Sequence, residues 1–323
     1  MKLSRRNFVR LAAGAAGLPA VSRSAWADVY PSRPVRMVVS FPAGYAPDIV
    51  ARVVGEPLSQ RLGQPVVIEN RPGAGSNIGT EVVVRARGDG HTLLITVAGN
   101  TMNATLYDDL KFDFARDIAP VASICGTPFV MMINPSVPAK TVPEFIAYAK
   151  ANPGRMNMAT PGVGTAPHVF GEMFKMMTSV ELAHVPYRSS FLPDLLGGQV
   201  QVAFMTVILS APYVRDGKLR ALALTTATPS ALLPGVPVMG EFVPGYDANG
   251  WVGVGAPKST PGKIIERLNK EINAVVADPN MTARLIGLGS VPMSMTVAEF
   301  GKLIADETDK WAKVIKFANI KAS

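Results

Sequence analysis

Hydrophobic positions near the N-terminus change their period, and the change marks a strand followed by a helix. Residues 35–40 are mostly apolar and rich in valine, which predicts a buried strand. Residues 41–47 contain two prolines and a glycine, so they cannot extend it. Beyond them, apolar residues recur at spacings of three and four. This pattern predicts a helix that Asp48 caps and Gly63 ends.

A second strand–loop–helix unit follows about a hundred residues later. Residues 156–159 form a strand candidate, residues 160–167 a glycine-rich loop, and a helical pattern begins at His168. Such units direct free backbone N–H groups and the positive end of a helix dipole towards the carboxyl end of the strand. That environment suits a carboxylate, and two copies indicate two lobes that face one ligand. Ordinary turns between a strand and a helix would give the same pattern, so this alternative stays open.

The remaining pattern alternates strands and helices along the whole chain, which indicates an α/β sheet protein. Further strands are predicted at residues 66–69, 92–97, 118–124, 129–133, 182–185, 199–205, 219–225 and 251–256. The last of these returns to the first lobe. We therefore predict one lobe from residues 28–125 plus 248–323, and a second from residues 126–247. Two crossings between the lobes make a hinge.

The N-terminus has the pattern of an export signal. A twin-arginine motif at residues 4–9 precedes an apolar stretch at residues 11–21, which is too short to span a bilayer. Ala25-Trp26-Ala27 is a small-x-small cleavage signal. We predict that residues 1–27 are a signal peptide, cleaved after Ala27, and that the mature protein is periplasmic. The motif favours twin-arginine (Tat) export, and the general secretory route remains an alternative.

Removal of this signal changes the charge of the protein. Residues 1–27 hold five of the 32 basic side chains and no acidic one, which leaves 27 basic against 24 acidic residues, a net charge of +3. So small an excess does not indicate nucleic-acid binding. The single cysteine, Cys125, cannot form an internal disulfide and lies in an apolar run, which predicts a core position.

Catalytic and cofactor motifs are scarce in the sequence. It contains no G-x-S-x-G, H-E-x-x-H or P-loop motif, and the glycines at 73, 75 and 79 miss the dinucleotide fingerprint by one residue. We therefore expect no enzyme, no cofactor and no metal site. His168 could donate to a ligand oxygen or hold its own loop. Arg188, after a predicted strand, could clamp a carboxylate or form a surface ion pair.

Several segments, in this order, resemble signatures of the Bug family, the periplasmic solute receptors of tripartite tricarboxylate transporters. They are residues 41–44 with Asp48, residues 69–75 with Gly79, residues 160–168, residues 185–188 with 194–200, and residues 251–261. The resemblance implies a type II periplasmic-binding, or Venus flytrap, fold of two α/β lobes joined by a two-crossing hinge. It further implies that the loops hold a carboxylate through backbone N–H groups and ordered water.

The sequence and the resemblance together give a set of expected ligand-binding residues. They are Phe41, Gly44, Tyr45, Ala46, Asp48, Asn77, Asn100, Thr160, Gly162, Gly164, Thr165, His168, Tyr187 and Arg188. Two positions depart from the family pattern, because Tyr45 stands where a glycine is usual and Pro47 where a threonine is usual. Weaker polar anchoring and more apolar contact follow, unless Tyr45 points out of the cleft. We therefore expect an aromatic or partly apolar monocarboxylate or dicarboxylate rather than citrate.

The function expected from this reading is that of a monomeric, extracytoplasmic solute-binding protein. It captures a small organic acid and delivers it to the membrane components of a tripartite tricarboxylate transporter. Two alternatives stay open: a receptor that docks on a membrane sensor kinase, and a hydrolase that uses a serine or histidine in the cleft.

Overall fold

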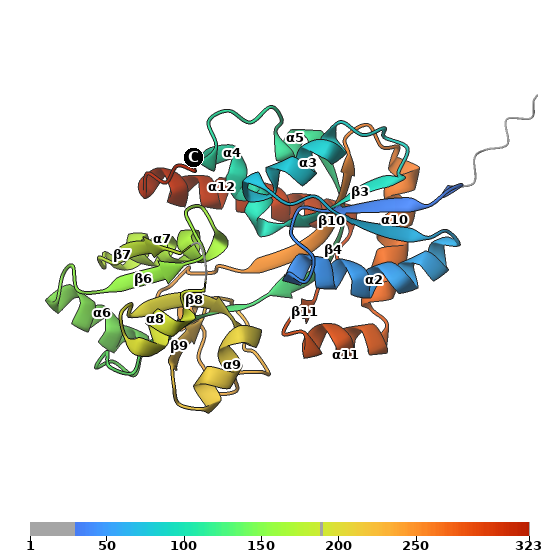
Figure 1. The fold of residues 1–323 in the computed structure, drawn as a ribbon. Coiled ribbons are helices and arrows are strands. Elements are labelled where there is room, and N and C mark those ends of the chain that lie inside the picture. The colour runs from blue at the N-terminus through green and yellow to red at the C-terminus, as the bar shows by residue number, and fades with distance from the viewer. Residues whose placement is uncertain (1–29, 188–189, 323) are drawn as a thin grey trace, which may run out of the picture.

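The computed structural model describes residues 30–187 and 190–322, and it folds them into two β-sheets with helices packed around each (Figure 1). The predicted signal peptide and Arg188 lie outside the described residues. None of the helices that the structure describes is long and apolar enough to cross a membrane.

The first sheet has six strands in the order β11-β4-β10-β3-β1-β2. Their bounds are β1 Val35–Val39, β2 Val66–Asn70, β3 Thr92–Val97, β4 Ile118–Thr127, β10 Gly250–Pro257 and β11 Val291–Pro292. Strands β1, β2 and β3 are parallel, whereas β10 runs antiparallel to both β3 and β4.

The second sheet has five strands in the order β7-β6-β8-β5-β9. Their bounds are β5 Phe129–Ile133, β6 Asn157–Thr160, β7 Ala183–Pro186, β8 Val202–Thr206 and β9 Arg220–Leu224. Strands β6, β7 and β8 are parallel, and β5 is antiparallel to β8 and β9.

The two sheets share one plan. In each, three parallel strands lie with the first along the chain between the second and the third, as β2-β1-β3 in one sheet and β7-β6-β8 in the other. The next strand, β10 or β5, is antiparallel to the third and is the first strand after the chain crosses from the other sheet. The chain passes from β4 to β5 through Pro128, and returns between Leu224 and Gly250 into β10. These passages are the two crossings that the sequence predicted.

Helices follow the parallel strands of each sheet. Those of the first part of the chain are α2 Ala46–Leu62, α3 Asn77–Val84, α4 Ala98–Leu106 and α5 Phe114–Asp117. Those of the middle part are α6 Val142–Ala151, α7 Ala166–Thr178, α8 Leu192–Gly197 and α9 Val207–Arg215. The last three are α10 Gly262–Val276, α11 Pro279–Gly287 and α12 Val297–Phe317, and short 3-10 turns occur at Ala74–Ser76 and Met239–Glu241. Because helices start at the carboxyl ends of parallel strands, the starts of α2, α3 and α4 gather at one edge of the first sheet, and those of α7, α8 and α9 gather at one edge of the second.

Alternation along β1 shows how the first sheet is buried on both faces. Val35, Met37 and Val39 pack with side chains of α2 and α10, whereas Val38 points to the other face, towards Val83 and Phe300. Successive residues of a strand point to opposite sides, so a strand that is apolar throughout must be covered twice.

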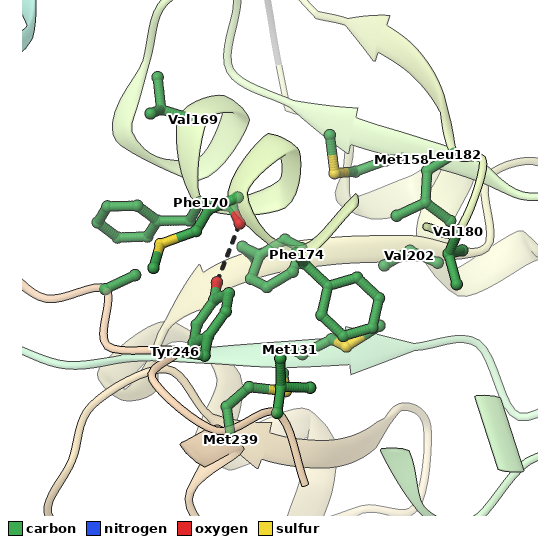
Figure 2. Close-up of a cluster of buried hydrophobic side chains, with 14 of the residues drawn as sticks. Met131, Met158, Val169, Phe170, Phe174, Val180, Leu182, Val202, Met239 and Tyr246 are labelled. Carbon is green, nitrogen blue, oxygen red and sulfur yellow. Dashed lines mark hydrogen bonds between the residues drawn. The ribbon is translucent and has the colours of Figure 1, made fainter. Parts of the chain in front are cut away.

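The second sheet follows the same rule. Met131 packs on one face with Phe170, Phe174 and Tyr246, as Figure 2 shows. The Tyr246 hydroxyl donates a hydrogen bond to the Phe170 carbonyl oxygen at 2.9 Å, the dashed line in that figure. A fully buried tyrosine thereby satisfies its only polar side-chain atom.

Helix α12 packs into two hydrophobic cores, that of the first sheet and that of the second. Near its start Phe300 packs edge-on against Trp251 of the first sheet, with ring centroids 5.4 Å apart. Near its end Trp311 stacks on Phe170 of α7 at 5.2 Å. Figure 1 shows this helix, in red, running from the first sheet towards α7. It is therefore a third physical link between the two halves, which the sequence did not predict.

Candidate ligand-binding site

The start of α2 is organised by a glycine and an aspartate four residues apart. Gly44 adopts φ +85°, in the left-handed region that favours glycine, and its N–H donates to Asp48 Oδ2 at 2.8 Å. The N-cap residue is Tyr45, and Pro47 lies in the first turn, where its missing N–H costs little. The prediction that Asp48 caps the helix is therefore wrong. Asp48 lies inside the first turn and holds the preceding loop.

Asp48 is the centre of a buried polar network. Its side chain is 2% exposed, and it accepts from Asn70 Nδ2 at 2.8 Å and from Arg52 Nε at 3.0 Å. Asn70 Nδ2 also donates to the Phe41 carbonyl oxygen at 3.0 Å. Burial alone would raise the pKa of Asp48, but hydrogen bonds from Arg52, Gly44 and Asn70 outweigh it and lower that pKa. The carboxylate therefore stays charged and fixes the loop.

The start of α7 repeats this design. Gly44-Tyr45-Ala46-Pro47-Asp48 has its counterpart in Gly164-Thr165-Ala166-Pro167-His168. Gly164 has φ +74°, and its N–H donates to His168 Nδ1 at 3.1 Å. Both helices begin at the alanine and carry proline in the first turn. One loop in each half of the molecule is thus held by a side chain that reaches back four residues.

The free donors differ from those the sequence suggested. The amides of Gly44 and Gly164 are already engaged, and Gly162 N–H donates to Thr160 Oγ1 at 3.2 Å. A helix leaves the amides of its first turn without intrahelical partners. Those of Ala46 and Asp48 in α2, and of Ala166 and His168 in α7, have no hydrogen-bond partner among the described residues.

His168 is buried and acts on its own loop. Because its Nδ1 accepts from Gly164, its Nε2 carries the hydrogen, and this nitrogen lies 3.6 Å from Glu172 Oε1. Its ring stacks on His184 with centroids 3.6 Å apart. Burial, together with the neighbouring His168, lowers the pKa of His184 to about 4. His184 is therefore neutral at physiological pH.

Thr160 ends β6 and supports the same loop. Its Oγ1 lies 2.6 Å from His184 Nε2 and receives the amide hydrogen of Gly162. A hydroxyl beside an imidazole resembles an activated nucleophile, but Thr160 is fully buried and its oxygen is occupied by the loop. The Thr165 hydroxyl donates to the Gly162 carbonyl oxygen at 2.8 Å. These hydroxyls shape the loop.

Asparagines connect the starts of α3 and α4. Asn103 Nδ2 donates to Asn77 Oδ1 and to the Gly75 carbonyl oxygen, both at 2.7 Å. Asn77 is 7% exposed, and its own Nδ2 has no partner among the described residues. Asn100 is occupied at both ends, since it accepts from Val97 N–H and donates to Thr80 Oγ1. Asn77 therefore retains a donor, whereas Asn100 only ties the two helices together.

The two halves touch through these loops. A Cβ placed on Gly75 would lie 2.5 Å from the Tyr107 hydroxyl oxygen, directly after α4. A Cβ on Gly164 would lie 3.1 Å from Leu106 Cδ1, at the end of α4. The glycine loops before α3 and α7 therefore both lie against the end of α4. Asn70, the last residue of β2, donates to the Phe41 carbonyl oxygen and to Asp48, so it ties β2 to the loop that carries Gly44.

The remaining expected residues are placed differently. Tyr45 is 59% exposed at the start of α2. Tyr187 is half-buried, and its hydroxyl donates to Asp194 Oδ2 at 2.6 Å, which ties it to α8. Arg188 lies outside the described residues.

Sequence reasoning missed three hydroxyls at the carboxyl ends of parallel strands. Ser40 follows β1, Thr96 lies near the end of β3, and Thr206 ends β8. Their side-chain oxygens are buried and have no hydrogen-bond partner among the described residues. The sequence signal that could have identified these hydroxyls is a polar residue at the end of an apolar strand.

Metal ions and cavities add little to this picture. No cluster of three or more potential metal ligands occurs in residues 30–187 and 190–322. Two surface hollows, of about 330 and 380 Å³, lie beside Tyr107 and Asp113 and between Met173 and Lys313. Neither hollow is lined by the starts of α2 or α7.

Known proteins share this architecture. The family model "Tripartite tricarboxylate transporter family receptor" matches residues 50–320. BugT of Bordetella pertussis is 34% identical over 300 residues, which cover 91% of this chain and 92% of the relative.

Solved structures agree with these sequence matches. R. palustris Rpa4515 with adipate is 33% identical, with a TM-score of 0.78 over 90% of this chain and 99% of that one. MatC of Rhodopseudomonas palustris with bound malate is 28% identical, with a TM-score of 0.74 over 88% and 100% of the two chains. The expected Venus flytrap fold is confirmed. The chain belongs to the receptor family of tripartite tricarboxylate transporters, whose members are periplasmic solute-binding proteins.

Proposed function

We propose that this protein captures one small organic carboxylate between its two lobes and delivers it to the membrane components of a tripartite tricarboxylate transporter. The observation that carries the proposal is the repeated start of α2 and α7, in which Asp48 and His168 hold matching loops. Each loop leaves first-turn amides without a protein partner, and such amides favour an anion. Similarity to proteins solved with adipate and malate supports a carboxylate.

The residues assigned to the ligand follow from this design. The amides of Ala46, Asp48, Ala166 and His168 bind the carboxylate, directly or through water, and Asn77 Nδ2 adds a side-chain donor. The other expected residues of the two loops shape the site. Residues 28–125 with 248–323 form one lobe and residues 126–247 the other, so the ligand favours the closed state by its extra contacts there.

A screen of the mature protein tests the proposal. A ligand that binds only the folded form raises its melting temperature by mass action. We expect at least one acid from a panel of monocarboxylates, dicarboxylates and tricarboxylates to do so, and its neutral amide or alcohol not to. If no acid of the panel raises the melting temperature or binds in calorimetry, the proposed function is wrong.

Delivery to a transporter needs a separate test, because a sensing receptor would bind the same ligand. Deletion of the gene should abolish uptake of the radiolabelled acid by intact cells, and a copy on a plasmid should restore it. Unchanged uptake, with a sensor kinase recovered by cross-linking, would instead favour the sensing role.

Recovery of the acid unaltered after long incubation with the protein is expected for a receptor, and its conversion to another compound would indicate an enzyme.

We also propose how the protein is exported and how many chains it contains. The mature protein begins at Asp28 after cleavage behind Ala27, reaches the periplasm by the twin-arginine route and is a monomer. N-terminal sequencing of the periplasmic protein checks the cleavage site, and replacement of Arg5 and Arg6 with lysine should block export by this route. Light scattering should give the mass of one chain, with and without the acid.

A further inference from the structure

Two adjacent residues at the end of α4 contact one glycine loop in each half of the molecule. A Cβ placed on Gly164, before α7, would lie 3.1 Å from Leu106 Cδ1 and 3.4 Å from Leu106 Cδ2. The hydroxyl oxygen of the next residue, Tyr107, would lie 2.5 Å from a Cβ placed on Gly75, before α3. The end of α4 is therefore the point at which both loops meet one rigid element.

Leu106 is buried in the core of the second sheet, although α4 follows β3 of the first. It is 2% exposed and belongs to the hydrophobic cluster that also contains Phe170 and Trp311. Protein interiors are close-packed, so a buried leucine moves only if its neighbours move with it. Leu106 therefore gives the loop before α7 a fixed surface to pack against.

The backbone of Leu106 is held by the segment that follows α12. Leu106 is the last residue of α4, so its carbonyl oxygen has no partner within the helix. The Ala322 N–H donates to this oxygen at 3.0 Å. Lys321 and Asp108 form an ion pair beside it at 2.8 Å, but both side chains are about two-thirds exposed, so the pair adds little.

The turn after α12 explains why the chain reaches α4. Asn319 adopts φ +50°, in the left-handed region that asparagine tolerates better than most residues. Its N–H donates to the Lys316 carbonyl oxygen at 3.2 Å, and the Ile320 N–H donates to the Ile315 carbonyl oxygen at 3.1 Å. This pair of hydrogen bonds is a Schellman motif, which ends the helix and turns the chain. Ile315 and Ile320 are both buried in the core that contains Leu106.

We propose that Leu106 is a positioning residue for ligand binding. It holds the loop before α7 in the conformation that presents the first-turn amides of that helix, and Ile320 and Ala322 in turn hold Leu106. This inference rests on the proposed function and adds to it a residue that acts through its loop. A loop that is ordered before the ligand arrives costs less free energy to bind, so loss of the Leu106 side chain should weaken binding.

Leu106→Ala and Leu222→Ala form a matched pair of variants. Both leucines are 2% exposed and lie in the same core, but Leu222 is on β9, which β8 and β5 separate from β6 and its loop. Both replacements leave a cavity and should lower the melting temperature. In hydrogen exchange of the mature protein without an acid, only Leu106→Ala should speed the exchange of residues 160–168. Equal exchange of this segment in the two variants would overturn the inference.

Affinity is the second readout. Malate, adipate, citrate and benzoate are titrated into the mature protein in calorimetry, and the acid that binds most tightly is kept. We expect Leu106→Ala to weaken its binding about fivefold or more, Leu222→Ala by less than about twofold, and Leu106→Met to restore most of the affinity. An equal loss in Leu222→Ala would show that affinity only follows stability, and would contradict the positioning role. If none of the four acids binds, the proposed function fails, and the exchange experiment alone decides the role of Leu106.

A backbone variant tests the support of Leu106 without a cavity in the core. Ala322→Pro removes the N–H that the Leu106 carbonyl oxygen accepts, whereas Lys321→Gln removes only the exposed ion pair with Asp108. We expect Ala322→Pro to speed the exchange of residues 160–168 and to weaken binding of the same acid about twofold, and Lys321→Gln to do neither. Wild-type exchange in Ala322→Pro would contradict the role given to the segment after α12.

Discussion

Replacing Asp48 with asparagine keeps the size of the side chain but removes its charge and one acceptor. In the wild type, Gly44 N–H and Asn70 Nδ2 each donate to this carboxylate at 2.8 Å, and Arg52 approaches to 3.0 Å. The asparagine amide must turn its NH₂ group towards one of these donors. One of these donors, both of which make partly buried hydrogen bonds, then loses its acceptor, which costs about 1–3 kcal/mol in the free energy of unfolding. Arg52 adds little, because its side chain is half exposed.

Urea unfolding measures this loss, and Arg52→Gln is the matched control. We expect Asp48→Asn to lower the free energy of unfolding by about 1–3 kcal/mol, and Arg52→Gln by less than about 1 kcal/mol. The affinity for the stabilising acid should fall in Asp48→Asn, because the loop before α2 is no longer held. Wild-type stability of Asp48→Asn at pH 7, or a larger loss in Arg52→Gln, would refute this account of the network.

The pH dependence gives the same experiment a second readout. The pKa of Asp48 is lower in the folded protein than in the unfolded chain, where it is about 3.9. Its stabilisation is therefore complete above that value and is lost as the pH falls through the folded pKa. The difference between wild type and Asp48→Asn should stay constant from pH 5 to pH 8 and narrow below about pH 4.

Three further predictions concern the second lobe and the core. Burial lowers the pKa of His184 to about 4, below the unfolded value of about 6.5. The free energy of unfolding should therefore decrease as the pH is lowered from about 6.5 to about 4, and His184→Gln should reduce this decrease in urea titrations. A pH profile that His184→Gln leaves unaltered would contradict this assignment. Trp311 is fully buried against Phe170, so Trp311→Ala should lower the free energy of unfolding by about 3–5 kcal/mol, and a loss below about 1 kcal/mol would mean that α12 does not anchor the second core. Burial raises the pKa of Cys125 to about 12, so a maleimide should label it only in urea, and rapid labelling of the native protein would show that the first core opens.

Local patterns predicted the strands and the general order of the fold well. The strand at Val35–Val39 and the helix end at Gly63 follow from short-range periodicity and from the left-handed glycine. Helix starts were less accurate. Pro47 and Pro167 read as breakers, yet both lie in the first turn, where proline is tolerated.

Contacts between distant segments could not be read from the sequence. The approach of Gly164 to Leu106, and of Ile208 to Gly289, depends on how the two sheets are placed. The residues around Leu209 are apolar, so the sequence does not show that this residue, in the first turn of α9, is exposed. The roles of Asp48 and His168 were only partly anticipated, because two different residue types make the same hydrogen bond to a glycine four residues earlier.

A crystal structure of the mature protein with its tightest-binding acid tests the central claim most directly. We predict a single carboxylate within about 3 Å of a first-turn amide of α2 and of α7, or joined to each by one water molecule. A carboxylate that contacts only one lobe, or an acid bound away from both Ala46 and Ala166, would contradict the account.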